Sequence, residues 1–222
     1  MGNCIAGGQL YNLAEQQLVD CDHVDNQQGC DGGFEDRALD WIVAQGGLCL
    51  ESAYPYTSGA TKKAGTCKTS CTKQPLPYIG NSVSIQGESA LTTALVTQPV
   101  TVAVYAGNDA WQYYQGGVVS SCPSGQSDHA VIAVGYGSNY YKIRNSWGAS
   151  WGEAGYIRLQ RNVGGDGTCN VAGQPAYPKL KAGPAPTSAP TKAPTKAPTK
   201  APTPAPTDAP SGSDSGSGSW WW

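Results

Sequence analysis

The sequence is poor in several residue types, and each shortage narrows the possible folds and partners. Methionine and phenylalanine each occur once among 222 residues, against 29 glycines. This composition favours a turn-rich mixed fold over a helical bundle. Only two histidines are present and no two cysteines are spaced C-x-x-C, so we expect no zinc site. The net charge is −2, which gives no basic surplus for binding nucleic acid.

Long hydrophobic runs are also absent. No stretch reaches the roughly 18 apolar residues of a membrane helix, so we expect no membrane span. The first ten residues, MGNCIAGGQL, lack the basic start and apolar run of a secretory signal. Cysteine, in contrast, is plentiful at eight residues, a number that indicates disulfides formed in an oxidising compartment. We therefore expect that the natural N-terminus is missing from this sequence.

The composition divides the chain into two parts. Residues 1–181 have the composition of a folded domain, whereas residues 182–222 are of low complexity, with A-P-T recurring every four residues up to a Gly/Ser/Asp linker. Proline at this density favours polyproline II, and threonine beside proline suits O-glycosylation. We therefore predict a Pro/Thr-rich stalk after the domain. The terminal Trp220–Trp222 is either an artefact of gene prediction or the opening of a lost module.

Hydrophobic periodicity places helices in the first half of the domain and strands in the second. Helical spacing predicts three helices, over 12–20, 34–45 and 88–97, the first with Asn12 as its cap. Runs rich in Val, Ile and Tyr predict four strands, over 100–105, 129–136, 140–146 and 155–160. Residues 48–82 are rich in turn formers and are expected to be a loop held by disulfides. This segregation predicts an α+β fold of two lobes with a cleft between them.

Two neighbouring stretches, SDHAVIAVGYG at 127–137 and YKIRNSWGASWGEAGY at 141–156, suggest catalytic chemistry. His129 begins a predicted strand, and a histidine that works as acid or base needs another group to fix one ring nitrogen. Asn145 ends the next strand, where its amide oxygen can accept the imidazole N–H without adding charge. Trp147 follows and can cover that bond. Alone, each residue is ordinary, a strand-end histidine and a turn-forming asparagine, but together they predict part of an active site.

With LAEQQLVDCD and GCDGG, these stretches resemble the papain family of cysteine proteases, in order from about residue 7 to about residue 178. The resemblance implies a papain-like two-lobe fold, with a helical L lobe and an antiparallel β-barrel R lobe, and a cysteine-type endopeptidase without cofactor or metal. It implies that His129 and Asn145 are catalytic and that Trp147 shields them. It assigns substrate binding to Gly32, Gly33, Phe34, Ala103, Asp128 and Gln174. It also implies the disulfides Cys21–Cys67 and Cys122–Cys169.

One part of the family pattern has no match. The nucleophile belongs to a C-G-[SA]-C-[WY] stretch about 130 to 150 residues before the histidine and asparagine. Cys4 is the only cysteine near that distance, but its context, GNCIAGG, aligns beyond the far end of the nucleophile's helix, so we interpret Cys4 as structural. Cys30 is expected to be unpaired, and Cys49 and Cys71 to pair with each other or with Cys4. The fold is thus expected to lack its N-terminal strand and most of its central helix.

The sequence therefore predicts a papain-like cysteine endopeptidase that is inactive and poorly stable in the form given. The alternative is a non-catalytic papain-like protein that binds peptides or a partner, and a purely structural wall protein is remote. We expect peptide or protein substrates, a monomer, no nucleic acid and no membrane span. The disulfides and the stalk indicate a secreted or cell-wall associated protein, with lysosome or vacuole as the alternative.

Overall fold

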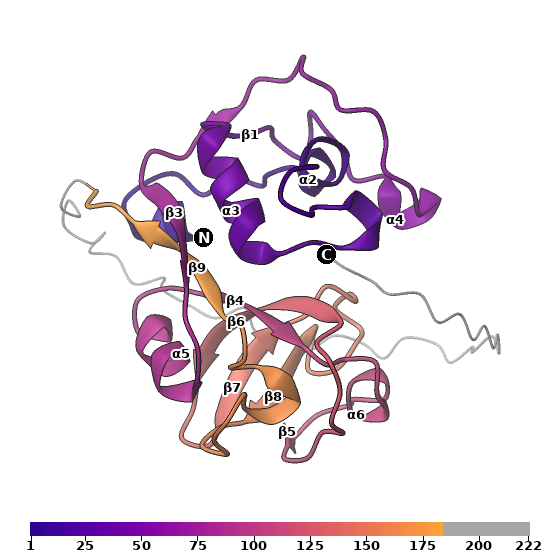
Figure 1. Ribbon diagram of the computed structural model, residues 1–222, viewed down its shortest axis with the longest axis vertical. Helices are drawn as coiled ribbons and strands as arrows, with labels where there is room; N and C mark the ends of the chain where they lie inside the picture. The colour runs from indigo at the N-terminus through magenta and orange to yellow at the C-terminus, as the bar shows by residue number, and fades with distance from the viewer. Residues whose placement is uncertain (184–222) are drawn as a thin grey trace, which may run out of the picture.

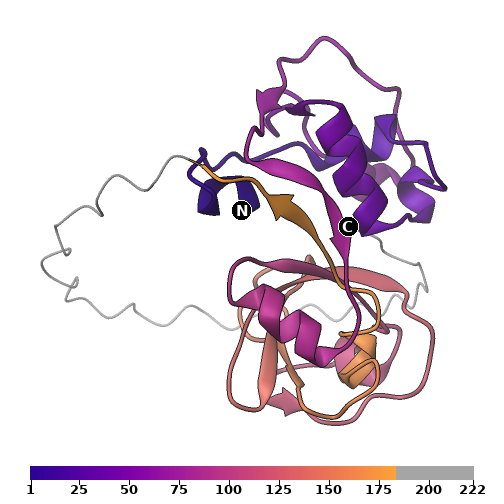
Figure 2. The same ribbon diagram turned by 60° about the vertical axis from the view of Figure 1, so that its left-hand side comes forward.

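The computed structural model describes residues 1–183, so the predicted stalk lies outside the described residues from 184 onward. Two lobes are evident, with the helices of the first half above and the sheet of the second half below (Figure 1). Strands β3 and β9 pair with each other and run from one lobe towards the other (Figure 2). The predicted α+β two-lobe fold is confirmed. No helix within residues 1–183 has the length and apolar character needed to cross a membrane.

The upper lobe contains short helices and a two-stranded sheet. Its elements are α1 (Gly2–Ile5), α2 (Glu15–Cys21), η1 (Gly29–Asp31), α3 (Glu35–Ala44), β1 (Gly47–Leu48), α4 (Ser58–Thr61) and β2 (Gln74–Pro75). The helices predicted at 12–20 and 34–45 are present as α2 and α3. The predicted cap is wrong, because α2 follows Ala14 and has no side-chain cap. Asn12 instead lies in an extended segment, where its carbonyl accepts the Glu51 N–H at 3.0 Å.

A buried carboxylate organises the upper lobe. Asp20 Oδ1 accepts bonds from the Gln16 amide and the Gly65 N–H, both at 2.6 Å, and Oδ2 accepts one from Tyr54 at 2.8 Å. Two disulfides, Cys21–Cys67 and Cys49–Cys71, close the loops around this network. The apolar core of this lobe is small, so covalent and polar contacts carry much of its order. The segment predicted to be a loop, 48–82, is therefore held in place, although it also contains α4, β2 and the start of β3.

The lower lobe is built on a seven-stranded sheet with the order β3-β9-β4-β6-β7-β8-β5. The four predicted strands are present as β4 (Val100–Val104), β6 (His129–Tyr136), β7 (Tyr140–Arg144) and β8 (Tyr156–Gln160). Three strands were not predicted, β3 (Ile79–Ser84), β5 (Val118–Val119) and β9 (Ala176–Leu180). Neighbours are antiparallel except β5 and β8. The remaining elements are α5 (Glu88–Leu95), which was predicted over 88–97, α6 (Asp109–Gln112) and η2 (Thr168–Asn170).

The larger hydrophobic core lies under this sheet. Alternate residues of β4, β6, β7 and β8 point inward and pack against Leu91 of α5 and Trp111 of α6, both fully buried. The third disulfide, Cys122–Cys169, lies beside this core. Its buried member, Cys169, accepts the backbone N–H of Tyr105, the residue directly after β4. The sheet is consequently a rigid base for side chains at the ends of β6 and β7.

Candidate active site

The β6–β7 hairpin brings His129 and Asn145 together. His129 is the first residue of β6, pairs with Val104 of β4 and is 2% exposed. Asn145 follows β7, and its backbone N–H donates to the Gly155 carbonyl at 2.9 Å. His129 Nε2 lies 2.8 Å from Asn145 Oδ1. Because that oxygen can only accept, Nε2 is the protonated ring nitrogen in this contact.

Two tryptophans, Trp111 and Trp147, contact the His129 ring, and Trp151 packs against both of them; the three are called the indole cluster below. The Trp147 ring stacks on the imidazole, with centroids 5.2 Å apart and planes at 25°. Trp111 meets the imidazole edge to face at 6.1 Å, and its carbonyl accepts the Trp151 Nε1–H at 3.1 Å. Trp151 in turn stacks on Trp111 at 5.8 Å. The cluster fixes the imidazole plane and excludes water from one side of it.

Trp111 was not identified from the sequence, whereas Trp147 was. Trp147 and Trp151 lie in the loop after Asn145, whose aromatic content was visible in the sequence. Trp111 comes instead from α6, a helix of four residues with no hydrophobic periodicity. The only local signal is Asn108 before it, a residue type that often precedes a helix.

Asp128 and Ala103, two of the residues expected to bind substrate, lie beside the histidine, and the Asp128 carboxylate is already engaged. Its two oxygens accept the backbone N–H groups of Ala106 and Gly107, at 2.7 and 3.0 Å. Ala103 is buried on β4, opposite Ala130. Asp128 therefore fixes the connection between β4 and α6, the helix that supplies Trp111.

The other predicted substrate residues come from different parts of the fold. Gly32, Gly33 and Phe34 connect η1 to α3, at the end of α3 away from β1 and nearest the lower lobe (Figure 1). The Phe34 ring is 43% exposed and lies under the Arg37 guanidinium at 4.3 Å. Gln174 is exposed between η2 and β9. Within residues 1–183, no hydrogen bond links Gln174 to His129, Asn145 or Asp128.

The cysteines behave largely as the resemblance implied. Cys21–Cys67 and Cys122–Cys169 are bonded, and Cys49 pairs with Cys71, one of the two possibilities left open. The free thiols within residues 1–183 are Cys4, exposed on α1, and the half-buried Cys30. Helix α1 packs against β9.

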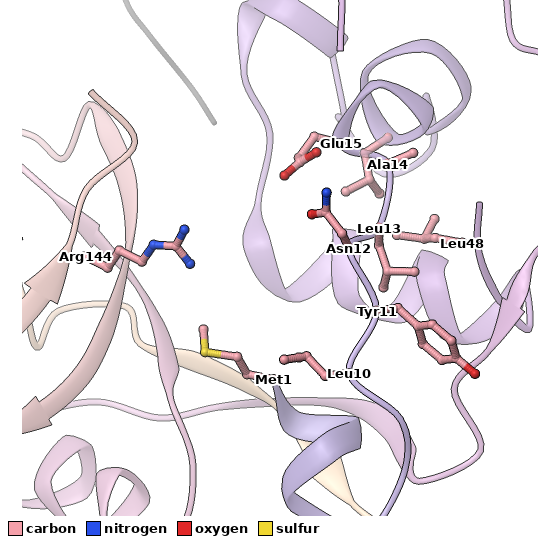
Figure 3. A pocket seen from close by; sticks show the side chains of 10 residues that line it. Met1, Leu10, Tyr11, Asn12, Leu13, Ala14, Glu15, Leu48 and Arg144 are labelled. Atoms are coloured by element: carbon pink, nitrogen blue, oxygen red, sulfur yellow. The ribbon is translucent and has the colours of Figure 1, made fainter. Parts of the chain in front are cut away.

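A cavity of about 680 Å³ opens between the lobes near the start of the chain. Apolar side chains of the upper lobe supply most of its lining, including Met1, Leu10, Leu13, Leu18 and Leu48. Glu15 from the upper lobe and Arg144 from the end of β7 lie on opposite sides of the space (Figure 3). Burial is the main cause of a raised pKa of the Glu15 carboxyl, and the neighbouring Glu51 carboxylate adds to it. A backbone hydrogen bond to Glu15 and, more weakly, Arg144 oppose this rise.

Comparison with known proteins agrees with this arrangement. The family model described as "Papain family cysteine protease" matches residues 2–179. The chain belongs to the papain family of cysteine proteases. Cysteine endopeptidase Rep1 of Oryza sativa subsp. japonica is 42% identical over 185 residues, which cover 79% of this chain and 48% of that protein. Cysteine proteinase COT44 of Brassica napus is 44% identical over 189 residues, covering 83% and 56%. The chain thus spans about half the length of these curated relatives.

Solved papain-family structures match the fold. The cysteine protease Amb a 11, a ragweed pollen allergen in its proform, superposes with a TM-score of 0.73 at 36% identity, covering 81% of this chain and 55% of that one. The bromelain protease of Ananas comosus in complex with the E64 inhibitor gives a TM-score of 0.69 at 36% identity, covering 81% and 90%. The two lobes and the sheet described above are therefore those of a papain-family protease.

Proposed function

We propose that this chain is the larger part of a papain-type endopeptidase domain that acts on peptides or proteins. In this proposal His129 is the acid and base, and Asn145 is the residue that orients it. The observation that carries the proposal is the 2.8 Å contact between His129 Nε2 and Asn145 Oδ1, enclosed by the indole cluster. Since Nε2 is committed to the amide oxygen, we assign proton exchange with a reacting group to Nδ1.

The proposed reaction follows from these roles. A cysteine thiolate attacks the carbonyl carbon of the peptide bond, and His129 donates a proton to the leaving amine. His129 then removes a proton from the water that hydrolyses the acyl-enzyme. Asn145 holds the ring in one orientation through both steps, and Trp147 keeps water away from their hydrogen bond. No metal or cofactor takes part in the proposed steps.

We assign substrate binding to the residues that line the two lobes. Gly32 and Gly33 receive the substrate main chain as an added strand. The side chain of the second residue before the scissile bond is placed among four residues, Phe34, Ala103, Asp128 and Gln174. The Asp128 carboxylate is held by two backbone N–H groups and cannot turn towards a substrate side chain. We therefore assign to it a role in the shape and polarity of this site, and not that of a charge that moves to meet the substrate.

The nucleophile is the part of the proposal that residues 1–222 do not supply. No C-G-[SA]-C-[WY] stretch occurs in the sequence, and Cys4 lies exposed on a helix that packs against β9. We propose that the chain as given is catalytically silent. The 680 Å³ cavity, with its apolar lining and the facing Glu15 and Arg144, is the space in which a helix carrying the nucleophile would pack.

Labelling with E64 tests the proposal. The 222-residue chain is expected to show no E64 adduct by intact mass and no hydrolysis of casein. A fusion that adds an N-terminal segment with a C-G-S-C-W motif is expected to form one adduct, at the new cysteine. That adduct should disappear in the His129→Ala variant of the fusion and persist in the matched control His23→Ala. Rapid labelling of Cys4 or Cys30 in the unextended chain, dependent on His129, would show that the nucleophile was wrongly assigned.

The second candidate is a non-catalytic protein that binds peptides or a partner in the same groove. Two observations together favour this candidate: the His129–Asn145 contact is present, and the sequence lacks the motif that carries the nucleophile. Peptide binding by the unextended chain, together with a fusion that never reacts with E64, would favour this candidate over the enzyme.

We further propose a domain over 1–181 that is carried on the stalk of 182–222, in a monomeric protein. The three disulfides support a secretory route, and we place the protein outside the cell or at the cell wall, with lysosome or vacuole as the alternative. Fractionation of cells that express a tagged chain checks the proposed location. Size-exclusion chromatography of the purified product checks that it is a monomer.

A further inference from the structure

The side chain of Gln27 binds the main chain of Phe34 at two points. Gln27 Oε1 accepts the Phe34 N–H at 2.7 Å, and Gln27 Nε2 donates to the Phe34 carbonyl at 3.1 Å. Phe34 is extended, with φ −124° and ψ 129°, so its N–H and C=O point to the same side. The Gln27 amide therefore occupies the place that a neighbouring strand would take.

Gln27 is itself held from behind. Its Nε2 has a second proton, which it donates to Asp22 Oδ2 at 3.3 Å, and its backbone N–H donates to the Val24 carbonyl at 3.0 Å. Gln27 is 7% exposed and Asp22 2% exposed. Asp22 immediately follows α2, so a buried chain of contacts runs from the end of this helix to the backbone of Phe34.

This contact determines how Gly33 is presented. In an extended chain the N–H and C=O groups of successive residues point to opposite sides, and Gln27 occupies the side to which those of Phe34 point. Within residues 1–183 neither the N–H nor the C=O of Gly33 makes a hydrogen bond. A Cβ at position 33 would lie 2.1 Å from Gln27 Oε1, so the close approach of Gln27 requires glycine there. Gly33 thus has the side of its missing side chain closed by Gln27, while its backbone donor and acceptor have no partner within residues 1–183.

We propose that Gln27, supported by Asp22, is a positioning residue that aims the N–H and C=O of Gly33 at the main chain of a bound peptide. Gln27 lies behind the Phe34 backbone and acts only through it. The inference rests on the proposed function, in which Gly33 receives the substrate backbone.

Hydrogen exchange tests the positioning role without any ligand. In the full chain, Gln27→Ala is expected to speed exchange of the Phe34 amide at least tenfold, because that amide loses its acceptor. The exposed neighbour gives the matched control, and Gln28→Ala should leave the rate unchanged. Asp22→Asn, which keeps an oxygen for Gln27 Nε2, should stay within about threefold of the parent chain. Equal Phe34 exchange in the Gln27→Ala variant and its control overturns the inference.

Peptide binding tests the functional consequence. The probe is a set of fluorescein-labelled peptides made from β-casein, with the tightest binder followed by fluorescence polarisation. Gln27→Ala is expected to raise its Kd at least fivefold. Ile157→Val, a core change in the other lobe with comparable loss of Tm, should leave the Kd unchanged. A Kd that rises equally in both variants reflects general destabilisation and overturns the positioning role.

The two proposals fail in different ways. If the parent chain binds none of the peptides and its E64-reactive fusion cleaves none, the proposed function is contradicted. The inference about Gln27 is then decided by the Phe34 exchange rate alone. If peptides bind and protect the Gly33 amide equally well with and without Gln27, the groove is right and the positioning role of Gln27 is wrong.

Discussion

At the residue scale, the orientation of Asn145 is fixed by two contacts to one oxygen. Oδ1 accepts the His129 ring and also the backbone N–H of Ser146, both at 2.8 Å. Rotating the amide by 180° would place Nδ2 against two donors, so the carboxamide has one favourable orientation. The imidazole of His129 is hydrogen-bonded to this oxygen and stacked on Trp147. The single orientation of the Asn145 amide therefore fixes the orientation of the imidazole ring as well.

Removing the acceptor should release the ring. In Asn145→Ala we expect the His129 ring to change from the Nε2–H tautomer to a mixture, observed by ¹⁵N NMR of the ring nitrogens. His23, whose Nε2 lies 3.0 Å from the Asp20 carbonyl oxygen, is the internal control in the same spectrum. In the E64-reactive fusion the variant should label about 10- to 100-fold more slowly, since a hydrogen bond to a charged group contributes roughly 1.5 to 3 kcal/mol. An unchanged His129 spectrum would rule out the orienting role.

At the element scale, the connection between β7 and β8 carries Trp147 and Trp151 and is fastened by Glu153. Glu153 Oε1 accepts the Gly117 N–H at 3.0 Å, and Arg158 Nε donates to Oε2 at 2.8 Å. Within the connection, Gly152 has φ +55°, and a Cβ there would meet the Tyr156 carbonyl oxygen at 2.7 Å. The position of the indole cluster therefore depends on a glycine turn and one ion pair.

The ion pair should give this segment a pH dependence of known sign. The hydrogen bonds from Arg158 lower the pKa of Glu153 below its ordinary value of 4.5. A carboxyl whose pKa is lower in the folded state stabilises the fold at pH values above its pKa in the unfolded state. This stabilisation is lost as the pH falls through its pKa in the folded state. Glu153→Gln should thus lower the free energy of unfolding by less than about 1 kcal/mol at pH 7, because the pair is partly exposed, and by a smaller amount near pH 3, which lies below the unfolded pKa.

Urea unfolding of the parent and the variant at both pH values measures this difference. Gln28→Ala, at an exposed uncharged residue, is the control and should differ from the parent by the same amount at both pH values. A deficit for Glu153→Gln that stays constant between the two pH values would contradict the assignment.

The elements that the sequence predicted are those whose pattern is local. The periodicity of 34–45 and the β-branched run of 129–136 each predicted an element, and the short hairpin then placed His129 beside Asn145. Strand β9 was missed because it contains Pro178, which is tolerated since β9 pairs with β4 only through Thr101 and Ala176. Trp111 and Gln27 were missed because their roles arise from tertiary contacts of a short helix and a polar turn.

At the scale of the whole molecule, the two lobes are stabilised by different kinds of interaction. The lower lobe has a continuous apolar core under its sheet, whereas the upper lobe relies on two disulfides and the Asp20 network. Between them lies the 680 Å³ cavity, and apolar side chains near it are open to solvent, with Leu10 62% exposed and Met1 49% exposed. The contact between lobes therefore leaves apolar surface that a further segment could bury.

Filling that cavity should stabilise the molecule as a whole. A helix from an N-terminal extension that covers three apolar side chains contributes about 1.5 to 3 kcal/mol for each one fully buried. With about 2 to 4 °C per kcal/mol for a chain of this size, the C-G-S-C-W fusion should melt roughly 10 to 35 °C above the 222-residue chain. It should also bind less of the dye ANS, which reports exposed apolar surface. A fusion with the same segment scrambled is the control and should melt with the unextended chain. If the unextended chain already melts cooperatively at the temperature of the fusion, the cavity is not the weak point of the fold, and a packed helix is not what it lacks.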